Sequence, residues 1–71
     1  MKNYNVQSVL IERKHYPTLG EAVQMLTSMG YNYYKHDITP HYFRFRQMDP
    51  SQFKGFFTKK GPKGVELVIG Y

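Results

Sequence analysis

One segment carries every signal of an α-helix, and because no other segment does so, it limits what the chain can fold into. Thr18 and Glu21 form a capping box, in which each side chain can accept a hydrogen bond from the backbone N–H of the other residue. An apolar stripe at three- and four-residue spacing follows to about Met29, and Gly30 can supply the left-handed residue that ends many helices. The stripe consists of Leu19, Ala22, Val23, Leu26 and Met29. We expect it to pack on a sheet built by the rest of the chain.

The segments on both sides of this helix have the composition of β-strands. The predicted strands are Val6–Lys14, a segment that begins at His41 and ends before Asp49-Pro50, Phe56–Lys59 and Val65–Tyr71. A loop rich in Gly and Pro, Lys60–Gly64, joins the last two as a hairpin. The order β-α-β-β-β predicts an α+β fold, with one helix packed on a three- to four-stranded, mostly antiparallel sheet.

Two connecting segments have less regular patterns. Tyr31–Pro40 is rich in Tyr, Asn and charge, and we expect a connection there with a short extended piece at Tyr33–His36. Asp49 is placed to cap a turn or one helical turn that runs to Gln52. Phe53 is then expected to anchor this loop to the core.

The chain has 71 residues, which is enough for one small domain spanning residues 1–71. Seven Tyr and five Phe offset the short length, since each buried ring removes roughly 150–250 Å² from water. No cysteine is present, which excludes a disulfide framework and a thiolate zinc site and fits a reducing compartment. The N-terminal residues Met1–Asn5 are polar and no long apolar run follows, so neither a secretion signal nor a membrane span is expected.

The net charge of +5 is concentrated in the second half of the chain. Residues 1–40 carry four basic against three acidic side chains, whereas residues 41–71 carry six basic against two acidic ones. A cationic C-terminal half favours anionic partners, such as nucleic acid or an acidic protein surface. The alternative is that the charge serves only solubility.

The segment from His41 to Met48 alternates aromatic and cationic side chains, so a strand there has two different faces. Phe43 and Phe45 share one face, which suits a core, and the other face presents cations about 7 Å apart, similar to successive phosphates on a strand. With Tyr42 stacking on a base and the hairpin lysines reaching the backbone, this face could bind DNA or RNA. The candidate residues are Tyr42, Arg44, Arg46, Lys59, Lys60 and Lys63. Alternatively, Arg44 or Arg46 pairs with Glu12 or Glu66 in a structural ion-pair network.

Catalysis and metal binding have little support in the sequence. There is no Gly-rich phosphate loop, nucleophile elbow or paired carboxylate, so no enzyme activity and no cofactor are expected. His15, His36 and His41 lie at a strand end and in loops, without the helical spacing of a metal site. The rival to nucleic-acid binding is therefore a structural role, in which exposed tyrosines and sheet edges bind protein subunits or further copies of the chain.

Two motifs stand out in the second half of the chain, YxRFRQxxP over residues 42–50 and VxLVIG over residues 65–70. With these motifs, the chain from about Val9 to Tyr71 resembles a small domain family found in tailed phages and large DNA viruses. The family has no established molecular function, so the resemblance implies no catalytic or binding residue. It implies a viral or phage-related protein of the host cytoplasm or the virion. We therefore expect a non-enzymatic viral binding module that contacts nucleic acid, or alternatively a virion or assembly protein.

Overall fold

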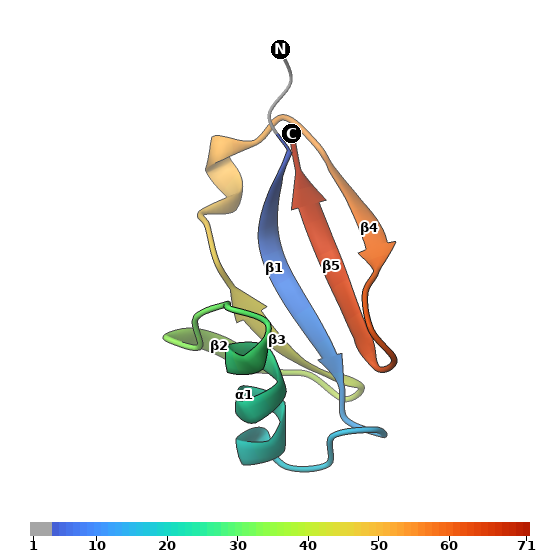
Figure 1. Cartoon of the computed structure of the whole chain (residues 1–71). Coiled ribbons are helices and arrows are strands. Elements are labelled where there is room, and N and C mark those ends of the chain that lie inside the picture. The colour runs from blue at the N-terminus through green and yellow to red at the C-terminus, as the bar shows by residue number, and fades with distance from the viewer. Residues whose placement is uncertain (1–3) are drawn as a thin grey trace.

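The computed structural model describes residues 4–71 as one helix lying on one face of a five-stranded sheet (Figure 1). Residues 1–3 lie outside the described residues. They begin the polar N-terminal segment, from which no secretion signal is expected. The elements are β1 (Asn5–Glu12), α1 (Leu19–Ser28), β2 (Lys35–Ile38), β3 (Tyr42–Arg46), the short 3-10 helix η1 (Pro50–Gln52), β4 (Phe56–Lys60) and β5 (Val65–Gly70).

The sheet is antiparallel throughout, with the strand order β2-β3-β1-β5-β4. This confirms the α+β class and the helix-on-sheet packing, but the sheet has five strands, not the three or four expected. The additional strand is β2, which lies in the segment expected to be a connection and overlaps the short extended piece predicted at Tyr33–His36 at its Lys35 and His36 positions. All four of its residues are exposed and none of its side chains belongs to the core, so it has no apolar pattern by which the sequence could reveal it.

Helix α1 begins and ends as its sequence predicts. Thr18 Oγ1 accepts a hydrogen bond from the Glu21 N–H at 3.2 Å, and a Glu21 carboxylate oxygen accepts one from the Thr18 N–H at 3.4 Å. After the helix, Gly30 has φ of +87°, and the N–H of Tyr31 returns to the carbonyl of Leu26 at 3.2 Å. These are the bonds of a Schellman motif, which satisfies the last carbonyl groups of the helix.

The core lies between α1 and strands β1, β3 and β5. Its buried side chains are Val9, Ile11, Ala22, Leu26, Phe43, Phe45 and Val65. Phe43 and Phe45 therefore have the core role predicted for them, and both lie on the face that α1 covers. All five residues of β4 are exposed, so the helix leaves this side of the sheet uncovered (Figure 1).

The segment between β3 and β4 crosses one end of the sheet, so these consecutive strands lie on opposite sides of β1 and β5 (Figure 1). Asp49 caps η1 as expected, since its carboxylate accepts from the Ser51 N–H at 2.9 Å. Phe53 anchors the crossing, because its ring lies over Gly70, where a Cβ atom would clash with it. The ring of Phe53 also meets Phe56 edge-on, with centroids 5.8 Å apart.

Candidate nucleic-acid interface

The face of the sheet opposite α1, called the outer face below, carries the aromatic and cationic side chains predicted to bind nucleic acid. Alternation along β3 puts Tyr42, Arg44 and Arg46 on this face, because Phe43 and Phe45 point into the core. The strand pairing then fixes their neighbours. Arg46 lies between Lys35 of β2 and Ser8 of β1, and Arg44 lies between Asp37 of β2 and Leu10 of β1.

Neither arginine forms an ion pair within the part of the chain that the structure describes. Within residues 4–71, the close contact between an acidic and a basic side chain joins His15 Nε2 to Glu12 Oε2 at 3.2 Å. The Nε atoms of Arg44 and Arg46 are covered by neighbouring atoms and have no hydrogen-bond partner. The alternative in which Glu12 or Glu66 neutralises these arginines structurally is therefore wrong.

Lys35 strengthens the positive charge at the Arg46 end of the outer face. Like charges directly opposite each other in a sheet are destabilising, and Lys35 is the cross-strand partner of Arg46. Asp49 lies near this pair: hydrogen bonds from Ser51 lower the pKa of its carboxyl group, and the charges of Arg46 and Lys35 lower it further. The exposed carboxylate of Asp49 thus faces two cations, and a second exposed carboxylate, that of Asp37, lies on the strand position opposite Arg44. We call Lys35, Arg44 and Arg46 the cationic cluster.

A hollow of about 170 Å³ adjoins this cluster, and Arg46, Lys35 and Tyr34 line part of it. Its wall is held by Gln47, whose side-chain amide donates to the Asn32 carbonyl at 2.8 Å and accepts from the Asn32 N–H at 3.0 Å. Tyr34 is 81% exposed, so its ring is accessible to a ligand. Sequence reasoning missed Lys35 and Tyr34 because both lie in or beside β2. The one available signal was the density of tyrosine and charge in that segment.

Tyr42 belongs to a different, acidic end of the outer face. Its hydroxyl group is hydrogen-bonded to the Glu66 carboxylate, and this bond, followed by the negative charge of Glu66, raises the pKa of the Tyr42 hydroxyl. Glu12, the cross-strand neighbour of Tyr42 on β1, adds to the same effect. Phosphate groups would be repelled from these carboxylates, so Tyr42 is poorly placed to stack on a base beside the cationic cluster.

The three hairpin lysines do not join the arginines, which corrects the expectation that the hairpin is adjacent to β3. Strands β1 and β5 lie between β3 and β4, a separation of about 14 Å at the usual strand spacing. Lys60 lies opposite Glu66 on the outer face, whereas Lys59 lies opposite Leu67 and points to the face that carries α1. Lys63 lies in the loop beyond. The segment that contains η1 crosses one end of the sheet, so the hairpin is not adjacent to β3.

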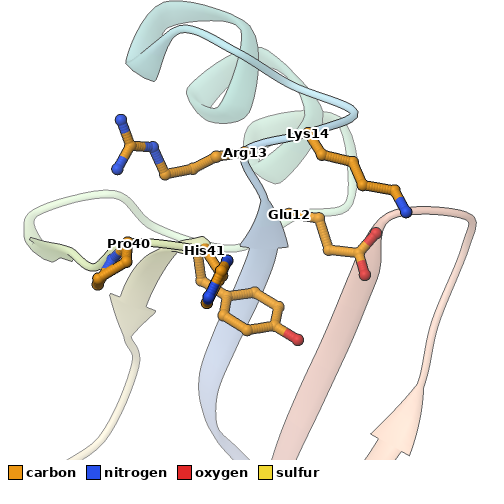
Figure 2. Close-up of a pocket in the computed structure, with 6 residues that line it drawn as sticks. Glu12, Arg13, Lys14, Pro40 and His41 are labelled. Carbon is orange, nitrogen blue, oxygen red and sulfur yellow. The ribbon is translucent and has the colours of Figure 1, made fainter.

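A second hollow, of about 260 Å³, lies where β1 ends near the loop between β2 and β3 (Figure 2). It is lined by Glu12, Arg13, Lys14, Pro40, His41 and Tyr42. Arg13 is already engaged in the fold, because its Nη1 donates to the Thr39 carbonyl at 2.8 Å and its guanidinium group lies 5.4 Å from the centre of the Phe43 ring. This hollow therefore has fewer available cations than its composition suggests.

Three further findings bear on function. No protein-family model, no curated protein and no solved structure matches the chain. Over residues 4–71, no three His, Cys, Asp or Glu side chains are grouped so that they could hold a metal ion. Within the same residues, no helix has the length and apolar character needed to cross a membrane.

Proposed function

We propose that this chain is a non-enzymatic module that binds single-stranded nucleic acid through the cationic cluster on the outer face. The observation that carries the proposal is the absence of an ion-pair partner for Arg44 and Arg46 within the described chain. Two unpaired guanidinium groups beside a third cation form a site for a chain of anions. Arginine suits this role because its planar fork can bind phosphate through two parallel hydrogen bonds.

The surroundings of the cluster favour an extended single strand over a duplex. Tyr33 and Tyr34 directly precede β2, with ring centres 5.5 Å apart and more than 45% of each residue exposed. Tyr34 also lines a hollow together with Lys35 and Arg46. Exposed aromatic rings beside a cationic track are the pattern by which proteins bind single strands without strong sequence preference, with bases stacking on the rings. The proposed contacts are therefore phosphates on Arg44, Arg46 and Lys35, and bases on the two tyrosines.

The test is the affinity for a labelled oligothymidylate, measured by fluorescence anisotropy over a salt series. Three phosphate contacts predict a slope of log affinity against log salt of about −2, since each contact to a single strand contributes about −0.7. Replacing Arg44 and Arg46 together by Ala leaves one contact and predicts a slope of about −0.7 with weaker binding at every salt concentration. No binding at low salt would overturn the proposal.

A matched control removes the same charge elsewhere. Lys14 and Lys54 are exposed and lie outside the cluster, so Lys14→Ala with Lys54→Ala lowers the net charge equally. We expect this variant to keep the wild-type slope. An equal loss in both double variants would show that net charge alone drives binding and would contradict a site at the cluster.

The second candidate function is a structural or assembly protein that binds other protein subunits. The observation that favours it is a group of exposed aromatic residues, Tyr4, Phe57 and Tyr71, beside the uncovered edge strand β4. For either function, the resemblance of the two sequence motifs to a phage and viral domain supports a viral source, with the protein acting in the host cytoplasm or in the virion.

A further inference from the structure

Strand β4 forms one edge of the sheet, and no other described element lies beyond it (Figure 1). The bonds at its two ends show which backbone groups remain available. Beyond one end, the N–H of Tyr71 donates to the Gly55 carbonyl at 3.0 Å, and beyond the other, the N–H of Gly61 donates to the Val65 carbonyl at 3.0 Å. In an antiparallel ladder, hydrogen-bonded pairs alternate with pairs that are not hydrogen-bonded.

This alternation directs the backbone groups of Phe57 and Lys59 toward β5 and those of Phe56, Thr58 and Lys60 away from the sheet. Three residues of β4 thus present both an N–H and a carbonyl group at the open edge. Such a row is a template for an added strand. The opposite edge, β2, is one residue shorter and consists of Lys35, His36, Asp37 and Ile38, three of which are polar or charged.

We propose that β4 pairs antiparallel with β4 of a second copy of this chain, about a two-fold axis at Thr58. In a two-fold strand pair, the residue numbers of opposed residues have a constant sum. Only an axis at Thr58 opposes all three outward residues: Thr58 to Thr58, Phe56 to Lys60, and Lys60 to Phe56. The pair then forms six intermolecular hydrogen bonds, two at each opposed pair.

The side chains of β4 match themselves in this register. The strand reads Phe-Phe-Thr-Lys-Lys, with aromatic residues at one end and cations at the other. Reversal about Thr58 sets Phe57 against Lys59 and Phe56 against Lys60 of the second copy, twice each, and opposes no lysine to a lysine. Lysine beside an aromatic face is attractive, and threonine pairs are favourable across strands.

A group of exposed aromatic residues lies beside β4. The rings of Tyr4, Phe57 and Tyr71 have centres 5.9 to 6.4 Å apart and are 57%, 45% and 42% exposed. Exposed apolar residues gathered in this way mark interaction sites. Phe57 belongs both to this group and to the proposed strand pair, so a second copy would cover part of the group. Helix α1 lies near β2 and β3, away from β4, and leaves the approach to the β4 edge open (Figure 1).

A second copy explains more of this edge than a nucleic acid does. Phe57 and Lys59 share one face of β4 and could, taken alone, contact a base and a phosphate. Nucleic acid would leave unused the outward backbone groups and the order of side chains about Thr58. Pairing with a second copy uses all five residues of the strand.

The experiment places opposite charges on the two-fold axis. Thr58 is exposed, so Thr58→Lys and Thr58→Glu should fold like the wild type, which circular dichroism checks. We expect sedimentation equilibrium of the wild type to show a mass that rises with concentration toward twice the monomer mass of 8.4 kDa. Concentrations should extend to the millimolar range, because a five-residue strand pair is smaller than the standard interface of about 1,200–2,000 Å².

Each charged variant alone should remain monomeric, since it brings two like charges together on the axis. An equimolar mixture of the two should dimerise, because the introduced lysine of one variant then meets the introduced glutamate of the other. A wild type that stays monomeric throughout, or a mixture that is no more dimeric than either variant alone, would overturn the proposal. A monomeric wild type whose oligonucleotide affinity falls in Phe57→Ala would identify the edge as a nucleic-acid surface instead.

Discussion

Arg46 is expected to destabilise the fold that carries it, and replacing it by Met should therefore raise the free energy of unfolding. Methionine keeps an unbranched apolar stem of similar length but removes the charge and the Nε donor. Two unfavourable contributions disappear: the opposition of Arg46 to Lys35, about 0.2–1 kcal/mol, and a buried donor without a partner, about 1–3 kcal/mol.

The lost attraction to Asp49 offsets part of this gain. The two contributions sum to about 1–4 kcal/mol, and after the lost attraction to Asp49 is subtracted we expect a net stabilisation of about 1–2 kcal/mol. For a domain of this size, that corresponds to a rise in melting temperature of about 4–16 °C. The assay is urea unfolding at low and high salt, and the gain should shrink at high salt because screening already weakens the repulsion from Lys35.

Arg13→Met is the matched control, since the chemical change is the same but the guanidinium group of Arg13 has partners in the fold, whereas the Nε atom of Arg46 has none. Arg13 donates to the Thr39 carbonyl and lies over the Phe43 ring, so its loss should destabilise by about 1–3 kcal/mol. If Arg46→Met destabilises the fold as Arg13→Met does, Arg46 has a structural partner and the functional reasoning fails. If it stabilises the fold and weakens oligonucleotide binding, Arg46 is retained for binding at the expense of stability.

Two further predictions concern the sheet and the helix. The hydrogen bond to Glu66 holds the pKa of Tyr42 above its ordinary value of 10.0. The bond therefore stabilises the fold below pH 10, and this stabilisation is lost as the pH rises through the raised pKa. In an absorbance titration at 295 nm, Tyr42→Phe should remove one late-titrating tyrosine, and an unchanged late phase would contradict the bond. Gly70→Ala should lower the melting temperature, because a Cβ atom at residue 70 would meet the Phe53 ring. Gly20 lies in α1 with open space around it, so Gly20→Ala should be neutral or stabilise the fold by up to about 1 kcal/mol. Equal effects of the two substitutions would contradict the packing of Phe53.

The parts of the fold that the sequence predicts are those fixed by local chemistry. The capping box at Thr18 and the left-handed Gly30 define α1, and alternation along β3 separates Phe45 from Arg46. Each of these depends on residues within a few positions of one another, so each leaves a periodic or short-range signal. The orientation of both arginines away from the core could therefore be predicted without the structure.

The missed features depend on pairing between distant segments. Strand β2 forms through backbone bonds to β3 while all its side chains are exposed, so Lys35 left no pattern that placed it beside Arg46. From the sequence, Lys59, Lys60 and Lys63 are expected to reach the nucleic-acid backbone from a hairpin loop beside the arginines, but the strand order inserts β1 and β5 between β3 and β4. The bond from Tyr42 to Glu66 likewise joins strands that only the topology brings together.

The central claim is that nucleic acid binds at the cationic cluster, and the most direct measurement maps the contact on the isotope-labelled protein. Amide chemical shifts should be recorded by NMR during titration with oligothymidylate at low salt. We expect the largest changes in β2 and β3, at Lys35, Arg44 and Arg46 and at the neighbouring Tyr34, with little change at Lys59. No shift changes at low salt, or changes centred on β4, would contradict the account.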